Sequence, residues 1–130
     1  MSSQLEENKK NAVAFYDLMF NQNNPSLAIE NYVGDEYIQH NPDVADGKQA
    51  FIDYFEKMAK EYPNKKVEFK QVIAGDNKVV LQCHQFWPGD HEYAGIDIFR
   101  FDDFGKIVEH WDVLQIIPLS NSAKNNNTMF

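Results

Sequence analysis

The sequence predicts an α+β fold in which three helices precede an antiparallel sheet, and two observations carry this prediction. Up to residue 62 the apolar side chains recur at helical spacing, whereas after Pro63 they alternate with polar ones, as in half-buried strands. Turn signals at residues 75–77, 88–90 and 102–105 separate four alternating segments, which is typical of an antiparallel meander. A chain of 130 residues has the usual size of one domain.

The three helices are bounded by capping and terminating residues. We expect the first over residues 4–22, where one side is apolar and the early turns are charged. Asn24, followed by a proline, is typical of the N-cap of a short second helix, which Gly34 would end. Asp46 is expected to cap the third helix, whose apolar stripe stops at Pro63.

The remaining segments are strands, one connection and a tail. Strands are expected over residues 67–73, 79–86, 93–101 and 106–116. Residues 37–42 are expected to connect the second and third helices. The single domain is expected to span residues 1–120. Residues 121–130 are Asn-rich without periodicity, and we expect them to be mobile or to pack on a partner chain.

Composition and charge exclude several classes of partner. The formal charge of −8 and the lack of clustered Lys and Arg argue against binding to nucleic acid or an anionic membrane. No apolar stretch approaches the ~20 residues that span a bilayer. The single cysteine, Cys83, cannot form an internal disulfide, and the N-terminal residues lack the pattern of a signal peptide. We therefore expect a cytoplasmic protein.

The candidate site residues lie on the last three strands. Residues two apart on a strand share a face. The sets that could meet on one concave face, if the phases of the strands match, are His110 with Asp112, Asp97 with Phe99, and His84 with Phe86. Such a face would combine imidazoles, carboxylates and aromatic rings, as a proton-transfer pocket for an apolar substrate does. Trp111 and Val113 would face the opposite side, where they favour a homodimer interface.

Several other interpretations of these residues stay open. Asp97 and His110 could form a buried ion pair that only fixes strand pairing. His84, His110 and Asp112 could form a metal-binding triad, but their spacing is not diagnostic. Cys83 lies on the opposite strand face from His84, so a nucleophilic role would need a further partner. The polar residues 37–42 could bind a ligand or form an ordinary Asn-Pro turn.

Two runs of the sequence resemble a known family. Residues 97–115, which contain Glu-His-Trp-Asp at 109–112, resemble the C-terminal hallmark of the SnoaL-like polyketide cyclases, a branch of the nuclear transport factor 2-like superfamily. Residues 37–42, followed by Asp46-Gly47, are similar to the N-terminal pattern of that family. The resemblance implies a cone-shaped barrel in which the N-terminal helices pack in a strongly bent antiparallel sheet. It also implies a dimer through the outer face of the sheet.

The resemblance further implies the chemistry of the site. Family cyclases close a ring by aldol condensation without a cofactor, with an aspartate as general acid/base. This makes Asp112 the acid/base candidate and His110 its neighbour, and we expect Asp112 to point into an enclosed cavity lined by aromatic side chains. The remaining pocket positions are expected to be Gln39, His40, His84, Phe86, Asp97 and Phe99.

Two functions are consistent with these residues. The first is a cofactor-independent enzyme of the aldol, isomerase or dehydratase type that acts on a small apolar carbonyl compound and needs no metal. The second is a ligand-binding or assembly module of the same fold without chemistry. An enzyme would expose Asp112 and His110 to a cavity, whereas a structural pair would be sealed and fully hydrogen-bonded.

Overall fold

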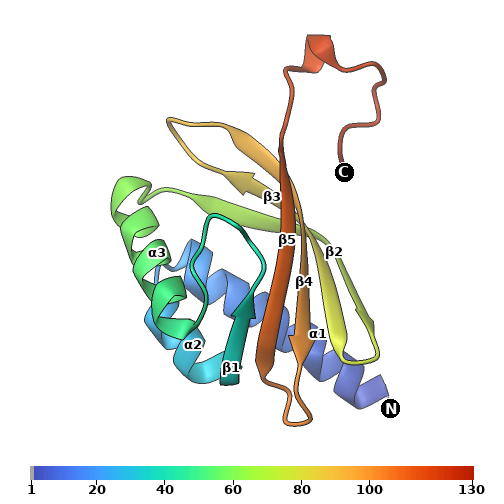
Figure 1. Cartoon of the computed structure of the whole chain (residues 1–130). Helices are drawn as coiled ribbons and strands as arrows, with labels where there is room; N and C mark the ends of the chain where they lie inside the picture. The colour runs from blue at the N-terminus through green and yellow to red at the C-terminus, as the bar shows by residue number, and fades with distance from the viewer. Residues whose placement is uncertain (1) are drawn as a thin grey trace.

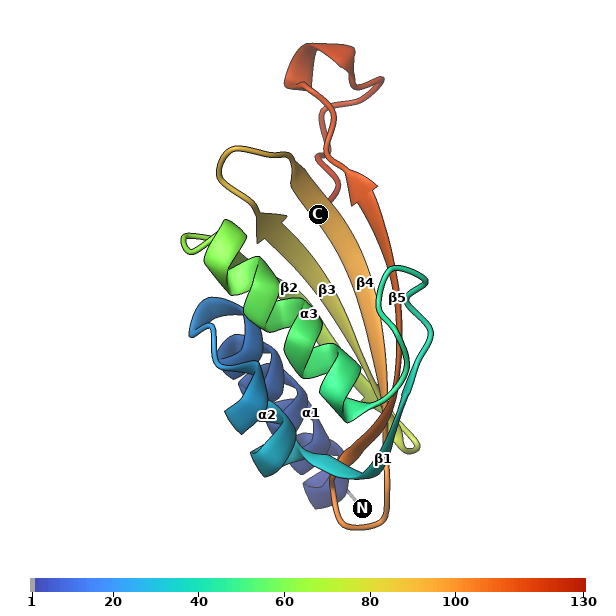
Figure 2. The same ribbon diagram turned by 60° about the vertical axis from the view of Figure 1, so that its left-hand side comes forward.

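Three helices pack on one side of a curled, unclosed sheet, in a computed structural model that describes residues 2–130 (Figures 1 and 2). The helices are α1 (Ser2–Tyr16), which continues as the π-helical turn η1 (Asp17–Asn21), α2 (Pro25–Tyr32) and α3 (Lys48–Glu61). We call the side of the sheet that carries the helices the inner face and the opposite side the outer face. Within residues 2–130, no helix has the length and apolar character needed to cross a bilayer.

The sheet contains the predicted meander and one further strand. Its strands are β1 (Val33–Gln39), β2 (Lys66–Gly75), β3 (Lys78–Phe86), β4 (Glu92–Phe101) and β5 (Ile107–Ile116). The spatial order is β1-β5-β4-β3-β2, and β2 to β5 pair antiparallel with their sequence neighbours. The α+β fold is therefore confirmed, with the bent sheet wrapped around the helices (Figure 2).

The expectation that all strands are antiparallel is wrong, because β1 pairs parallel with β5. Residues 33–39 were expected to end the second helix and enter a connection, yet they form this edge strand. Its register is irregular between Val33 and Ile38, and its centre carries the exposed Asp35 and Glu36. Strand formation here depends on the distant β5, so local sequence signals do not show it.

The predicted caps have different outcomes. Asn24 caps α2 as expected, since its side chain accepts a hydrogen bond from the Leu27 N–H at 3.2 Å. Asp46 is not the cap of α3, because Gly47 occupies that position with a φ of 93° and without a side-chain bond. The Asp46 carboxylate instead accepts from the backbone N–H of Gln39 at 2.8 Å. It therefore ties the loop before α3 to the end of β1.

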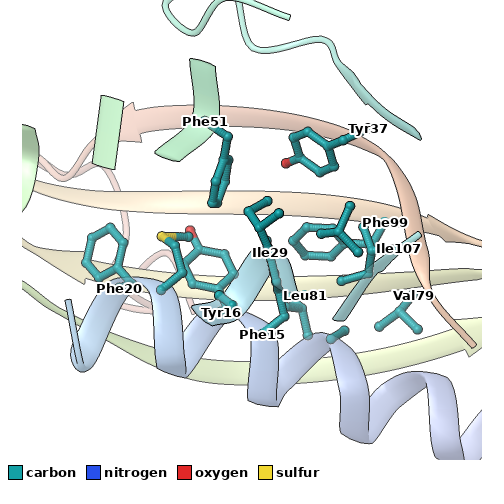
Figure 3. Packing of buried hydrophobic residues seen from close by; sticks show 14 of the residues in the cluster. Phe15, Tyr16, Phe20, Ile29, Tyr37, Phe51, Val79, Leu81, Phe99 and Ile107 are labelled. Carbon is teal, nitrogen blue, oxygen red and sulfur yellow. The ribbon is translucent and has the colours of Figure 1, made fainter. Parts of the chain in front are cut away.

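The core lies between the helices and the inner face and is rich in aromatic rings (Figure 3). Phe15 of α1 packs against Phe51 of α3 and against Phe99 of β4, with ring centroids 5.5 and 5.7 Å apart. Leu81 and Cys83 of β3 are fully buried on the same side. The odd-numbered residues of β3 therefore face the helices, and this phase decides which polar residues can join a site on the inner face.

The C-terminal segment turns back over the outer face after a short helical turn, η2 (Ser120–Ser122). The Gln82 side chain donates a hydrogen bond to the Met129 carbonyl at 3.2 Å. The Phe130 ring stacks on His84 with centroids 4.7 Å apart, and the Lys70 ammonium lies over the same ring. The end of the chain thus contacts β2 and β3 on the side away from the helices.

Candidate functional site

Two carboxylates and one histidine meet on the inner face of β4 and β5. The strand register places Asp97 directly opposite Asp112, and Phe99 opposite His110. The Nε2 atom of His110 lies 2.9 Å from Asp97 Oδ1 and 4.0 Å from Asp112 Oδ2. We call Asp97, His110 and Asp112 the acid–histidine cluster. As predicted, residues two apart on β5 share a face.

The cluster is enclosed to different degrees around its three members. Asp97 is only 1% exposed, and its Oδ2 atom has no hydrogen-bond partner among the described residues. The Phe99 ring stacks on the His110 imidazole with centroids 4.8 Å apart. The Asp112 side chain is 10% exposed. Asp112 is therefore the more accessible of the two carboxylates.

The end of β1 supplies two further groups to the cluster. Gln39 pairs with His110 in the sheet, and its Oε1 atom lies 2.8 Å from His110 Nδ1. The Asn41 side-chain amide donates to Asp112 Oδ2 at 3.2 Å. Gln39 was a predicted site residue, whereas Asn41 was not singled out. Asn41 was included only in the polar run of residues 37–42, which could bind a ligand or form an ordinary Asn-Pro turn.

The electrostatic surroundings favour proton exchange at Asp112. Burial raises the pKa of Asp112, the His110 charge opposes this increase, and Asp97 adds to it. The Asn41 hydrogen bond lowers the pKa of Asp112 by a smaller amount. The resulting upward direction moves this carboxyl group from the ordinary aspartate pKa, about 3.9, toward neutral pH.

Two buried groups around the cluster remain protonated. Burial, followed by the Asp97 charge, raises the pKa of the Cys83 thiol, so this side chain is a poor nucleophile. Burial likewise raises the pKa of Tyr37, whose ring stacks near His110 with centroids 6.4 Å apart. The exchangeable proton of the cluster therefore belongs to its carboxylates and imidazole.

Three predicted pocket residues lie away from the cluster, and the expectation that they join one inner face is not met. His84 and Phe86 stack on each other on the outer face, with centroids 4.0 Å apart, since even-numbered residues of β3 point away from the helices. His40 bonds to Glu109 at 2.7 Å and stacks on Trp111. The apolar residues Val79, Leu81 and Cys83 already indicated that the odd-numbered side of β3 is buried against the helices, so that His84 points to the opposite side.

The metal-binding triad of His84, His110 and Asp112 is not formed, because His84 lies on the outer face and the other two residues lie on the inner face. The structure instead brings ligand atoms of Asp97, His110 and Asp112 within 4.8 Å of one another. Two carboxylates and one imidazole form a donor set that could accept a divalent cation. The 2.9 Å contact between His110 and Asp97 is, however, already a hydrogen bond, which suits acid/base chemistry without further ligands.

Three cavities of the structure lie apart from the cluster. A cavity of about 680 Å³ lies between the C-terminal segment and His84 and Lys70. A smaller cavity of about 180 Å³ lies beside Ile96 and Val113. Another, of about 530 Å³, lies along α1 next to Val72 of β2. The enclosed cavity expected beside Asp112 stays a prediction.

Comparison with known proteins matches the chain to one family model and to solved structures of similar fold. Residues 10–121 match the model of the SnoaL-like polyketide cyclase family. No curated protein has a sequence that matches the chain significantly. AclR from Streptomyces galilaeus, a proposed hydroxylase, has a similar structure, with a TM-score of 0.71, 21% identity, and coverage of 90% of this chain and 84% of AclR.

Two further solved structures share the fold at low sequence identity. A proposed polyketide cyclase from Bacillus cereus has a TM-score of 0.69 and 21% identity, with coverage of 84% of this chain and 74% of that protein. A nuclear transport factor 2-like protein of unknown function from Mesorhizobium loti has a TM-score of 0.69 and 19% identity, with coverage of 86% and 93%. At these identities the structural likeness establishes the fold alone.

Proposed function

The chain belongs to the SnoaL-like polyketide cyclase family, and on this premise we propose that it is a cofactor-independent acid/base enzyme acting on a small apolar carbonyl compound. The reaction is of the aldol cyclase, isomerase or dehydratase type. The observation that carries the proposal is the environment of Asp112, a largely buried carboxyl group with a raised pKa that lies 4.0 Å from His110 Nε2.

In the proposed step, the Asp112 carboxylate removes a proton from the carbon next to the substrate carbonyl. The C–H bond breaks, the proton moves to an Asp112 oxygen, and the electron pair enters the enolate. In the aldol reaction the enolate carbon attacks a second carbonyl, and the alkoxide that forms takes the proton back from Asp112. In an isomerase the proton returns to another carbon of the enolate. In a dehydratase the enolate expels the β-hydroxyl group, which leaves as water with the proton from Asp112. A positioned acid/base group contributes typically ~10²–10⁴-fold to such a rate.

His110 is proposed to act as the neighbour of Asp112, on the same wall of the site and 4.0 Å from its Oδ2 atom. Its Nε2 atom and the Asp97 carboxyl group face the same side of the strands as Asp112. Aromatic rings continue from the cluster toward α3, since Tyr37 packs on Phe51 with centroids 5.3 Å apart. These rings favour an apolar substrate, because the groups around the polar cluster offer few hydrogen bonds.

One observation favours the alternative, a ligand-binding or assembly module without chemistry. Both ring nitrogens of His110 have hydrogen-bond partners, and the Asp97 side chain is almost fully buried. A buried, hydrogen-bonded His–Asp pair also occurs as a purely structural element. The alternative therefore differs from the main proposal only in whether Asp112 exchanges protons with a ligand.

Solvent deuterium exchange separates the two functions. Small ketones, 1,3-dicarbonyl compounds and β-hydroxy ketones are incubated with the protein in D₂O, and deuterium at the carbon next to the carbonyl is followed by NMR. The enzyme accelerates exchange in at least one class, and heat-denatured protein does not. A compound that raises the melting temperature of the protein but exchanges at the uncatalysed rate would support the non-catalytic module instead.

We also propose that the protein is a homodimer through the outer face. Val113 is 75% exposed there, and its cross-strand neighbour Ile96 is 45% exposed. Apolar side chains of this size and exposure, next to one another on a sheet, favour a protein interface. The helices cannot cover them, because all three pack on the inner face (Figure 2).

A further inference from the structure

We propose that Gln39 is a positioning residue, which holds His110 in the form with hydrogen on Nδ1 and thereby keeps one proton between His110 Nε2 and Asp97. The catalytic consequence rests on the proposed function. The hydrogen positions themselves can be measured without a substrate. Gln39 thus acts through His110. It was expected from the sequence to line the substrate pocket, but this role needs no contact with substrate.

The orientation of the Gln39 amide follows from a backbone group. The Asn41 N–H lies 3.0 Å from Gln39 Oε1. A backbone N–H can only donate, so the side-chain atom that it meets must be the amide oxygen. The amide nitrogen then points to the Tyr37 hydroxyl at 3.3 Å. The two contacts agree with each other and define one orientation of the amide.

The orientation of Gln39 determines which His110 nitrogen carries hydrogen. His110 Nδ1 lies 2.8 Å from the same amide oxygen. An amide oxygen can only accept, so Nδ1 must be the donor. The second hydrogen bond of an imidazole often selects its tautomer in this way. In neutral His110, Nε2 is consequently the unprotonated nitrogen.

The contact on the other side of the ring then requires one more proton. His110 Nε2 lies 2.9 Å from Asp97 Oδ1. A neutral imidazole and an ionised carboxylate would place two lone pairs against each other at this distance. The contact is attractive only if Nε2–H donates to the carboxylate or if the protonated Asp97 donates to Nε2. In both forms the His110–Asp97 pair holds one shared proton and has zero net charge.

Asp112 lies next to this shared proton but is held separately. The Asp43 N–H donates to Asn41 Oδ1 at 2.8 Å, which turns the Asn41 amide nitrogen toward Asp112. Tyr37 and Cys83, which also face His110 or Asp97, stay protonated because burial raises the pKa of each. Asp112 is therefore the carboxylate of the cluster that is free to gain or lose a proton during a reaction.

The backbone around Gln39 makes it suitable for this role. Its N–H donates to Asp46, and the next residue, His40, donates its N–H to the His110 carbonyl at 3.0 Å. The parallel pairing of Gln39 with His110 fixes the two side chains on neighbouring strands. The backbone contacts thus fix where the side chain begins, and the Asn41 N–H and the Tyr37 hydroxyl hold its amide group. A rotation of the amide away from His110 would break both of these side-chain contacts.

The experiment is an NMR measurement of ¹⁵N-labelled histidine at neutral pH without substrate. In the wild-type protein we expect hydrogen on His110 Nδ1. Gln39→Leu removes the acceptor and should shift the His110 resonances toward the other tautomer, while Gln39→Glu keeps an acceptor and should retain hydrogen on Nδ1. Gln71→Leu is the matched control, because Gln71 is exposed and its side chain bonds to Gln82 on the outer face, away from His110.

The outcomes separate this proposal from the proposed function. A wild-type His110 that lacks hydrogen on Nδ1, or an unchanged His110 signature in folded Gln39→Leu, would overturn it. If the protein exchanges substrate protons, Gln39→Leu should lower kcat about 10- to 100-fold with little change in KM, and Gln39→Glu should restore part of it. A confirmed Nδ1–H without any exchange activity would refute the enzyme but keep the positioning role.

Discussion

The Lys65 side chain is buried at the junction of the helices and the sheet, although lysine is seldom enclosed. Its ammonium group donates to the Phe20 carbonyl at 2.9 Å and to the Asn23 side chain, and it lies over the Phe20 ring. It therefore satisfies a carbonyl at the end of η1. Burial lowers the pKa of Lys65 to about 8, because the charged form loses hydration.

The lowered pKa predicts a pH-dependent contribution to stability. Between pH 8 and 10 the unfolded chain, with an ordinary lysine pKa of about 10.4, binds more protons than the folded chain, so the contribution of Lys65 rises with pH. Cys83 and Tyr16 act in the opposite direction, because burial raises the pKa of each. Their effects cancel in a comparison of wild type with Lys65→Met.

We expect the difference in free energy of unfolding between wild type and Lys65→Met to increase by about 1–3 kcal/mol from pH 7 to pH 10. Urea denaturation at a series of pH values measures it. A difference that stays constant across this range would show that the folded-state pKa of Lys65 is close to its ordinary value.

Among the elements, β1 is a strand whose placement depends on one small residue, Gly34. A Cβ at Gly34 would lie 2.8 Å from Asp102 Oδ2 and 3.0 Å from Val108 Cγ1. Asp102 cannot move freely, since its other oxygen accepts from the backbone N–H groups of Phe104 and Lys106. Gly34 therefore permits the close approach of β1 to β5 that places Gln39 beside His110.

We predict that Gly34→Ala lowers the free energy of unfolding by about 1–3 kcal/mol, the usual cost of inserting a methyl group into a packed site. Gly75→Ala is the matched control, because nothing lies within 4 Å of a Cβ at Gly75 in β2 and its φ is not positive. Chemical denaturation of both variants checks the prediction. Equal stabilities of the two would mean that β1 does not need the space at Gly34.

At the same scale, strands with strong local signals were predictable and β1 was not. Turns separate β2, β3, β4 and β5 from one another. Together with the alternating apolar residues, they define where the strands lie and which residues share a face, including His110 and Asp112. In β1 the exposed Asp35 and Glu36 follow Gly34, and all three residue types are depleted in strands. Only pairing with β5, about 70 residues later in the chain, makes this segment a strand.

The pairing of His110 with Asp112 was predictable from the sequence, whereas the positions of His84 and Asn41 were not. Spacing alone placed His110 and Asp112 together, but alternation does not say which phase of a strand faces the helices. His84 was therefore grouped with the wrong face, although the apolar Leu81 and Cys83 beside it indicated the buried phase. Asn41 was missed because its contact with Asp112 arises from the tertiary fold.

For the whole molecule, the outer face gives a testable account of assembly. We predict that the wild-type protein is a dimer at micromolar concentration and that Val113→Glu produces monomers, because it places a charge in the apolar interface of an already acidic chain. Phe104→Ser is the control, since Phe104 is 88% exposed at the β4–β5 turn. Analytical ultracentrifugation distinguishes the species. A monomeric wild type, or a dimeric Val113→Glu, would contradict the proposed interface.

The division of the chain into a domain of residues 1–120 and a tail of residues 121–130 stays a prediction. Met129 lines the same outer-face groove as Ile96 and Val113, so a partner on this face would meet the tail as well. The tail contacts Gln82, His84 and Lys70 on the outer face. The acid–histidine cluster lies on the inner face, on the other side of the sheet. The chemistry proposed for Asp112 is therefore separate from the arrangement of the tail.

The central claim, proton transfer by Asp112, is tested most directly by Asp112→Asn. This change keeps the size of the side chain and an oxygen that can accept from Asn41, but removes the titratable group. With any compound that the wild-type protein exchanges or converts, kcat should fall by about 10²–10⁴-fold while the melting temperature stays near the wild-type value. Asp103→Asn, in the exposed β4–β5 turn, should leave the rate unchanged. An Asp112→Asn protein that melts earlier yet turns over at the wild-type rate once folded would contradict the claim.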